Sequence, residues 1–249
     1  MFYDGLEDAY TGRAMGSFAQ ETANEKGLTR EQMDAFAIQS LNRACKAIES
    51  GALKAEIVPV TVTSRKGETV VDVDEQPLSA RPEKIPHLKP AFAKDGTITA
   101  ANSSSISDGA SALVLTTAGE ALRRGLAPVA RILGHARHSH EPGLFTTAPI
   151  GAMQKLFAKT GWSKDDVDLF EINEAFAMVT MLAIRELGLD EARVNVHGGA
   201  CAQGHPIGSS GSRIIVSLMY ALRRPGKQRG VASLCIGGGE ATAVAIELL

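Results

Sequence analysis

The second half of the chain alternates between short apolar stretches and segments with helical periodicity, and this alternation restricts the fold more than any other feature. Apolar strands that alternate with helices predict a sheet covered on both faces, so we expect an α/β fold. The last two strands, separated only by a glycine turn, should form a hairpin. The expected strands are 110–116, 129–135, 167–172, 194–196, 231–236 and 241–248, and the expected helices are 117–124, 149–159, 175–187 and 208–222.

The first hundred residues carry a different pattern. A helix is expected over 29–50, because Thr29 and Gln32 fit a capping box and Gly51 follows the last apolar position. Short β-prone pieces at 56–63 and 68–73 flank a basic turn, and several prolines follow them. We therefore expect one helix and otherwise irregular, surface-wrapping structure in this part of the chain.

The composition is that of an ordinary globular protein, with 44% hydrophobic residues, 22% charged residues and a formal net charge of -2. This balance gives no electrostatic reason to expect nucleic acid or an anionic membrane as a partner. Three widely spaced cysteines, Cys45, Cys201 and Cys235, favour neither a disulfide framework nor a zinc site and indicate a reducing compartment. The sequence has no apolar run of about 20 residues and no basic leader in its first residues, so we expect a cytoplasmic protein.

Three polar groups stand where apolar segments give way to tight turns, a place where rigid folds expose chemical groups. They are an amide, an imidazole and a thiol. Because the carboxyl ends of strands in an open α/β sheet meet at the edge where ligands bind, we expect the three groups to converge there. The motifs are Asn-Glu-Ala-Phe at 173–176, Gly-His-Pro-Ile-Gly at 204–208 and Cys-Ile-Gly-Gly-Gly at 235–239.

Each group also has a purely structural interpretation. Asn173 fits a helix N-cap, His205 fits a residue that braces a glycine-rich loop, and Cys235 fits a small buried hydrophobe. The chemical alternatives are an amide aimed at a water or a substrate oxygen, an imidazole that transfers a proton near neutral pH, and a thiol beside backbone N–H groups. Taken together, the three motifs favour a catalytic site over coincidence.

Other candidate sites carry less weight. His135, His138 and His140 resemble a metal cluster, but only Glu141 stands near them as a further ligand. Cys201, four residues before His205, could form a Cys/His pair, although its position between two glycine-rich turns fits backbone packing equally well. The sequence contains no phosphate-binding or serine-hydrolase motif.

At these motifs the chain resembles the thiolase family, the acyltransferases that make or cleave a carbon–carbon bond between two acyl groups carried by coenzyme A. The long glycine- and histidine-containing stretch is the most specific part of the match. The resemblance rests on 173–176, 195–208 and 235–239, with support from 30–37, 56–59, 96–100 and 107–110, and so covers essentially the whole chain.

The resemblance implies a role for each group. His205 would activate the nucleophilic cysteine of the first half-reaction and help hold the thioester oxygen of the second substrate, together with a water positioned by Asn173. Cys235 would be the general acid and base at the substrate α-carbon, and Gly237 would lend its backbone N–H to the oxyanion hole. Coenzyme A would be substrate and product, with no permanently bound cofactor and no metal.

The resemblance also implies an architecture. An irregular, partly helical loop domain over 1–106 would contact coenzyme A, and a layered αβα domain would cover 107–249. Residues 107–126 would belong to the sheet of an N-terminal half that this sequence lacks. A homodimer or homotetramer is the expected assembly. The residues expected to line the coenzyme A path are Leu88, Phe92, Ala100 and Ser104, with Arg65 and Lys66 as candidates for phosphate contact.

The sequence departs from the family pattern at several points. The family's reactive cysteine lies in the N-terminal half, and neither Cys45 nor Cys201 matches its motif, so we expect a truncated thiolase without that nucleophile. His197, Gln203 and Phe145 replace the usual asparagine, aliphatic residue and methionine, and Phe145 puts the acyl-chain preference in question. Two alternatives remain: a catalytically inactive module that binds coenzyme A or assembles with partners, and a ketoacyl-synthase-like condensing enzyme, against which Cys-Ile-Gly-Gly-Gly argues.

Overall fold

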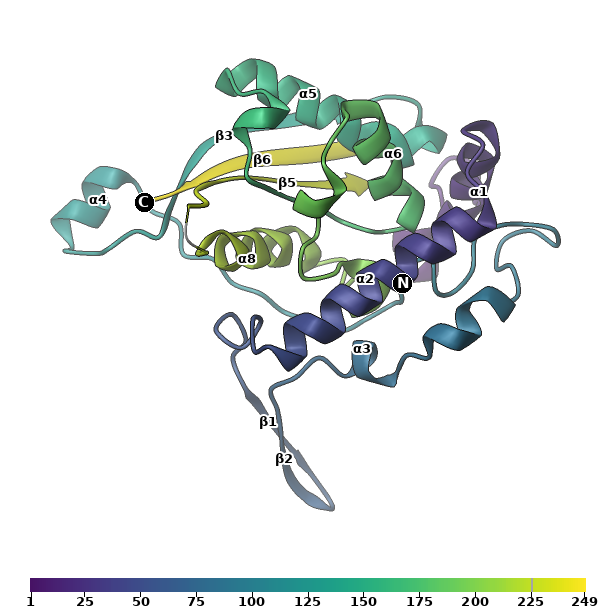
Figure 1. The fold of residues 1–249 in the computed structure, drawn as a ribbon, viewed down its shortest axis with the longest axis horizontal. Helices are drawn as coiled ribbons and strands as arrows, with labels where there is room; N and C mark the ends of the chain where they lie inside the picture. Colours follow the sequence, from purple (N-terminus) through teal and green to yellow (C-terminus); the bar gives the residue numbers. More distant parts are fainter. Residues whose placement is uncertain (225) are drawn as a thin grey trace.

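A four-stranded mixed sheet forms the centre of the structure, a computed structural model that describes residues 1–224 and 226–249 (Figure 1). The strand order is β3-β6-β5-β4, with antiparallel pairing of β6 to both β3 and β5 and parallel pairing of β4 to β5. The hairpin expected at the C-terminus is therefore confirmed. The strands are β3 (Ala130–Ser139), β4 (Leu169–Ile172), β5 (Arg229–Ile236) and β6 (Glu240–Leu248).

Helices cover both faces of this sheet, as the alternating pattern predicts. Helices α5 (Ala148–Thr160) and α6 (Ala177–Leu187) lie on one face, and α8 (Ser210–Leu222) lies on the other (Figure 1). Consecutive residues of β5 point to opposite faces, so Val231 packs with α5 and Ala232 packs with α8. Helices on both faces explain why β4 and β5 are buried along nearly their whole length, whereas the edge strand β3 is exposed or half-buried.

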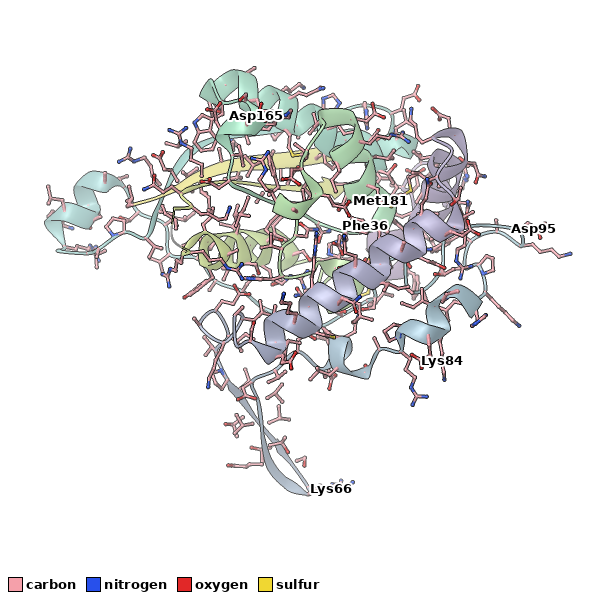
Figure 2. The ribbon with its side chains drawn as sticks, viewed as in Figure 1. Phe36, Lys66, Lys84, Asp95, Asp165 and Met181 are labelled. Carbon is pink, nitrogen blue, oxygen red and sulfur yellow. The ribbon has the colours of Figure 1, made fainter. Side chains whose placement is uncertain are left out.

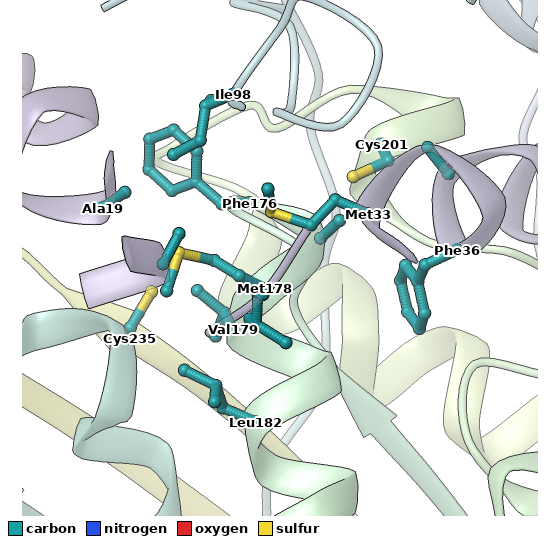
Figure 3. Packing of buried hydrophobic residues seen from close by; sticks show 14 of the residues in the cluster. Ala19, Met33, Phe36, Ile98, Phe176, Met178, Val179, Leu182, Cys201 and Cys235 are labelled. Atoms are coloured by element: carbon teal, nitrogen blue, oxygen red, sulfur yellow. The ribbon is translucent and has the colours of Figure 1, made fainter. Parts of the chain in front are cut away.

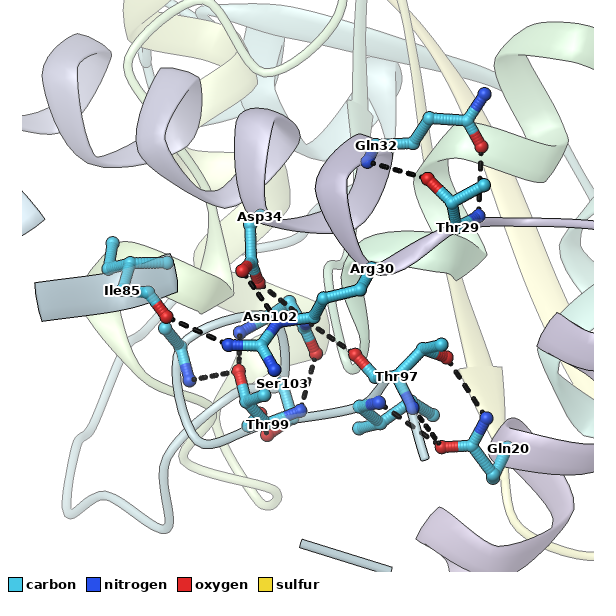
Figure 4. Close-up of polar contacts among 12 residues, drawn as sticks. Gln20, Thr29, Arg30, Gln32, Asp34, Ile85, Thr97, Thr99, Asn102 and Ser103 are labelled. Atoms are coloured by element: carbon cyan, nitrogen blue, oxygen red, sulfur yellow. Dashed lines mark hydrogen bonds and ion pairs between the residues drawn. The ribbon is translucent and has the colours of Figure 1, made fainter. Parts of the chain in front are cut away.

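The first hundred residues form two helices that pack beside the sheet. Helix α2 (Arg30–Glu49) begins at the expected capping box: Gln32 N donates to Thr29 Oγ1 at 3.2 Å and Thr29 N donates to Gln32 Oε1 at 3.0 Å (Figure 4). Helix α1 (Met15–Glu25) has no counterpart in the sequence expectations, because a central run of polar residues obscures its apolar face. Residues from α1, α2 and α6 share one hydrophobic cluster, in which Ala19, Met33 and Met178 are fully buried (Figure 3).

Short elements complete the chain. Several are single turns within stretches expected to be irregular. They are η1 (Phe2–Leu6), α3 (Glu75–Ser79), η2 (Pro82–His87), α4 (Ala118–Arg123), η3 (Pro142–Thr147), η4 (Lys164–Asp166), η5 (Glu191–Arg193) and α7 (Ala200–Gln203). In the part of the chain that the structure describes, no helix combines the length and apolarity that crossing a bilayer requires.

A buried polar network ties α2 to the chain that enters the α/β part. Asn102 Nδ2 donates to Asp34 Oδ1 at 2.9 Å, and Asn102 Oδ1 accepts from Thr99 N at 2.8 Å. Arg30 Nε donates to the other oxygen of Asp34 at 2.6 Å (Figure 4). Beyond this network, Ala177 N donates to Asn102 O at 2.8 Å, so α6 starts against the same segment. The network thus fixes residues 102–104 beside the 173–176 motif.

Two expected strands and one β-prone stretch differ from the structure. Residues 110–116 have no paired strand in the described part of the chain, and Val114 is 93% exposed. Residues 194–196 contribute only a single bridge, from Val194 to Phe170, because Asn195 turns the backbone away with a φ of 47°. The stretch 56–63 becomes a strand only at β1 (Val60–Ser64).

The strand β1 pairs with β2 (Gly67–Val71) in a hairpin whose residues are all exposed. Figure 2 shows Lys66 at the tip of this hairpin, away from the rest of the molecule. Arg65, in the same turn, therefore lies on an arm rather than beside the sheet.

A buried carboxyl joins the loop after α2 to α8. Glu56 Oε1 accepts from Ser217 Oγ at 3.0 Å, whereas Glu56 Oε2 is buried without a hydrogen-bond partner. Burial raises the pKa of Glu56 to about 7. A raised carboxyl pKa means that the ionised form is disfavoured in the folded state. The free energy of unfolding should therefore fall as the pH rises from the pKa of Glu56 in the unfolded chain through its pKa in the folded chain.

We predict that Glu56→Gln removes this penalty. Between pH ~5 and pH ~8 the native chain should lose on the order of 2 kcal/mol more stability than the variant, allowing for partial solvent screening at the site. Urea unfolding at the two pH values measures the difference. Glu83→Gln, which changes an exposed carboxyl, is the control and should follow the native chain. Parallel pH profiles for the native chain and Glu56→Gln would contradict the prediction.

Candidate functional site

The parallel pair of β4 and β5 places two of the three motifs next to each other. Ile172 lies opposite Ser233, and Asn173 N donates to Ser233 O at 3.0 Å. Asn173 is thus the first residue past β4, and Cys235 lies two residues farther along β5 than Ser233. The convergence expected at the carboxyl edge of the sheet is present for these two residues.

His205 reaches the same edge by another route. A bridge joins His205 to Ile106, and His205 N donates to Ser105 O at 3.1 Å. The segment that leaves the polar network at Asn102 therefore holds the histidine loop against the sheet edge. Asn173 Nδ2 lies 3.4 Å from His205 Nε2.

The site opens into a cavity of about 780 Å³, far larger than a neighbouring cavity of about 290 Å³. His205, Cys235 and Gly237 lie on its wall, whereas Asn173 lies behind His205. Most of the remaining wall is apolar. It includes Met15, Phe92, Phe145 and Phe176. The polar part of the wall comes from serines such as Ser103 and Ser104 and from the acidic residues Asp4, Glu7 and Asp8.

His205 is held as a neutral imidazole. Ser210 Oγ lies 2.6 Å from His205 Nδ1 and donates to Pro206 O at 3.1 Å, so its oxygen accepts from the Nδ1–H of the ring. This assigns the lone pair to Nε2, which faces the Asn173 amide. Burial, together with the positive charge of Arg213, lowers the pKa of His205 to about 4. The ring is therefore a proton acceptor at neutral pH.

Cys235 belongs to both the core and the cavity wall. Its side chain is 6% exposed and packs in the cluster that contains Phe145 and Phe176 (Figure 3). Burial raises the pKa of the Cys235 thiol to about 12, so the sulfur carries its proton at neutral pH. The structural and chemical interpretations of Cys235 are thus compatible: a buried thiol that still faces the cavity is a proton donor.

Asn173 combines burial with an unused acceptor. The residue is 2% exposed, and Asn173 Oδ1 has no hydrogen-bond partner in the structure. A buried amide oxygen without a partner is costly unless a water or ligand satisfies it. The N-cap interpretation does not hold, because α6 begins at Ala177 after Phe176.

Two residues that the motifs did not single out complete the arrangement. Ser210 sets the tautomer of His205, and Glu174 accepts hydrogen bonds from Asn195 and Cys201 in the loop before His205 and from Ser40 on α2. In the sequence Ser210 reads as an ordinary residue at a helix start, and Glu174 is only a member of its motif. Their partners are distant along the chain or depend on the loop conformation, so spacing alone could not reveal them.

The residues expected along the coenzyme A path divide between two cavities. Phe92 and Ser104 line the large cavity, whereas Leu88 and Ala100 line a separate one of about 290 Å³. Arg65 lines neither cavity. Their roles stay predictions.

The other candidate groups lie apart from the large cavity. Cys201 lines the smaller cavity, and burial raises its pKa well above the usual thiol range. Cys45 lies within α2, where its sulfur contacts Pro77 O. His138 and His140 stack edge to face with ring centroids 5.0 Å apart. Among residues 1–224 and 226–249, no group of three or more histidine, cysteine or carboxylate side chains is placed to hold a metal ion.

Comparison with known families and proteins agrees with this geometry. The thiolase N-terminal domain matches residues 1–119, and the thiolase C-terminal domain matches residues 126–248. An acetyl-CoA acetyltransferase of Paracoccus denitrificans is 46% identical over 99% of this chain and 63% of that protein. The cytosolic acetyl-CoA acetyltransferase of Mus musculus is 48% identical over 98% of this chain and 62% of that protein.

Solved structures of related proteins are similar to this one over almost its whole length. The acetyl-CoA acetyltransferase of Bacillus anthracis superimposes with a TM-score of 0.95 at 44% identity, over 98% of this chain and 62% of that one. A thiolase of Ascaris suum in complex with coenzyme A gives a TM-score of 0.89 at 44% identity, over 99% of this chain and 63% of that one. The fold is therefore that of the thiolases.

The chain belongs to the thiolase family, which confirms the resemblance carried by its motifs. It spans 62–63% of the length of these four relatives.

We predict that Ser210→Ala allows the His205 ring to adopt either neutral tautomer without moving the loop. With the serine present, the ring should be protonated at Nδ1 only, because Ser210 Oγ accepts a hydrogen bond from Nδ1–H. The variant should populate both neutral tautomers, which differ by about 1 kcal/mol or less once one hydrogen bond is lost. Nitrogen-15 shifts of the ring distinguish the two forms. Ser212→Ala, two residues farther along α8 and not bonded to His205, is the control. Identical ring shifts in the native chain and Ser210→Ala would refute the assignment.

Proposed function

We propose that the chain performs the acid–base chemistry of a thiolase acyltransferase, acting on acetyl-CoA and acetoacetyl-CoA or a longer 3-ketoacyl-CoA. One observation carries the proposal: a neutral imidazole and a protonated thiol lie on the wall of one largely apolar cavity. The names of the related acetyl-CoA acetyltransferases and the coenzyme A complex of the Ascaris suum thiolase support the substrate class.

The protonation states suit cleavage of a 3-ketoacyl-CoA. When the carbon–carbon bond breaks, the departing acetyl-CoA is an enolate, and the Cys235 thiol gives its proton to the α-carbon. The resulting thiolate removes the same proton in the condensation direction, so one residue serves both directions. Burial favours the neutral thiol and thereby makes it the acid of the cleavage direction.

His205 and Asn173 act on the oxygen side. The free lone pair at His205 Nε2 accepts a proton from an attacking thiol, and the protonated ring then donates to the thioester oxygen. Asn173 Oδ1, which lacks a partner, accepts from a water that donates to the same oxygen. The backbone N–H of Gly237 serves a different oxygen, that of the acyl-enzyme, and each such oxyanion contact typically contributes about 3 kcal/mol to transition-state stabilisation.

The remaining assignments are part of the same proposal. Phe92 and Ser104 contact the pantetheine arm in the large cavity, and Leu88, Ala100 and Arg65 contact more distant parts of coenzyme A. Residues 1–106 act as the loop domain and 107–249 as the catalytic α/β domain, with 107–126 pairing in a second sheet. The working protein is a cytoplasmic homodimer or homotetramer.

Complete acyl transfer also needs a nucleophilic thiol. Neither Cys45 nor Cys201 lies on the wall of the large cavity, so the acyl-accepting cysteine would come from the part of a thiolase outside this sequence. A second candidate function follows from the same observation: a module that binds coenzyme A thioesters and assembles with partners without turning them over.

Titration with acetyl-CoA and a thiolysis assay on acetoacetyl-CoA separate the two functions. We predict saturable binding by the native chain, with Cys235→Ala retaining it within about threefold and losing at least about 100-fold of any carbon–carbon cleavage, as expected when an acid–base group is removed. Cys45→Ala is the matched control and should change neither. Binding without cleavage by the native chain would favour the binding module, and absence of saturable binding would contradict both functions.

A further inference from the structure

A buried carboxylate lies directly beside Asn173 and has no part in the chemistry described above. Glu174 is 1% exposed. Its Oε2 accepts from Ser40 Oγ at 2.7 Å and from Cys201 N at 3.1 Å, and its Oε1 accepts from Asn195 Nδ2 at 2.8 Å. Because buried charges are retained only where hydrogen bonds compensate them, three donors on one carboxylate indicate a specific task.

The donors belong to the loop that leads to His205 and to the helix behind it. Asn195 and Cys201 both precede His205 in this loop, and Ser40 lies on α2. Ser40 Oγ also accepts from Gly199 N at 2.9 Å, so this hydroxyl links the Glu174 carboxylate to a further residue of the loop. The carboxylate is thus bonded, directly or through one hydroxyl, to three positions along residues 195–201.

The loop has no space to move closer to this anchor. A Cβ built on Gly199 would lie 2.3 Å from the Glu174 carboxyl carbon, and one built on Gly198 would lie 2.5 Å from Ser40 O. Glycine is needed at both positions because the backbone passes directly over Glu174 and α2. The contacts therefore fix the path of the loop in more than one direction.

Asn195 connects the same anchor to β4. Its Oδ1 accepts from Ile172 N and its Nδ2 donates to Ile172 O, both at 2.8 Å, so the side chain pairs with the last residue of β4 as a strand would. The amide of Asn195 cannot flip without losing both bonds. Its Nδ2 is consequently committed to face Glu174 as a donor.

The ionised form of Glu174 fits this environment. Burial raises the pKa of the carboxyl, while the donors from Asn195, Ser40 and Cys201 and the charge of Arg43 act in the opposite direction. All three bonded groups are donors, and a protonated carboxyl would bring a fourth donor without an acceptor.

We infer that Glu174 is the positioning residue of the site: its carboxylate fixes the 195–201 loop and the end of β4 relative to each other, and thereby holds His205 Nε2 against the Asn173 amide. The catalytic consequence rests on the proposed function, whereas the positional claim concerns the chain itself. Glu174 touches neither the cavity nor a substrate.

Glu174→Gln tests the inference because it preserves shape and replaces one acceptor by a donor. With the amide oxygen on Asn195, the amide nitrogen faces Cys201 N, which loses its acceptor. We predict that the Cys201 amide exchanges with solvent at least about tenfold faster, the equivalent of one lost hydrogen bond. We also expect the His205 pKa to rise towards its usual value as the loop loosens and water enters. NMR titration of the ring and hydrogen exchange measure both effects without any turnover.

Glu56→Gln is the matched control, since it also replaces a largely buried carboxyl by an amide. It should leave the Cys201 amide and the His205 titration unchanged, because Glu56 bonds to Ser217 on α8 rather than to the loop. If Glu174→Gln does not fold, Ser40→Ala removes one donor and the link to Gly199, and the same two readouts should shift in the same direction by a smaller amount.

A folded Glu174→Gln, or a folded Ser40→Ala where the first variant fails, with native exchange and native His205 titration would overturn the inference. Equal shifts in Glu56→Gln would also overturn it, because the effect would then be general loosening. Where the native chain turns over substrate, Glu174→Gln should lower kcat and leave KM for the CoA thioester within about twofold. Failure of the native chain to bind acetyl-CoA would refute the proposed function and leave the positional result intact.

Discussion

The parallel pairing of β4 with β5 is the constraint on which the rest of the site depends. Their register sets Ile172 opposite Ser233, so the chain leaves β4 at Asn173 beside the end of β5, where Cys235 lies. A shift of this register by one residue would exchange the faces of every side chain in β4, sending Phe170 and Ile172 towards α8 and Leu169 away from it. The buried clusters on both faces of the sheet exclude that shift, so the core that stabilises the fold also places the reactive groups.

The same apolar surroundings act in opposite directions on the two titratable groups. Burial lowers the pKa of His205 and raises that of Cys235, and in each case it favours the neutral form. One environment therefore supplies an acceptor and a donor without any charge partner between them. Hydrogen bonds orient the His205 ring and its loop from behind this apolar wall. They come from Ser210, Asn173 and the Glu174 carboxylate.

The elements of the fold that depend on neighbouring residues could be predicted from the sequence. The capping box of α2, the hairpin of β5 and β6 and the helices that stop at Gly161 and Gly188 depend on neighbouring residues, and the structure has all of them. Residues 110–116 were expected to be a strand from their composition alone, but a strand also needs a paired neighbour. Glu174 and Ser210 could not be foreseen, because their contacts depend on the folded path of the 195–204 loop.

The central claim is that substrate chemistry takes place where His205 and Cys235 share the wall of the large cavity. A structure determined with acetyl-CoA bound tests it most directly. The account predicts the acetyl group in the large cavity, with its thioester oxygen beside His205 and bonded to a water held by Asn173 Oδ1, and its methyl carbon against Cys235 Sγ. An acetyl group seated in the smaller cavity beside Leu88 and Cys201, with His205 and Cys235 untouched, would contradict it.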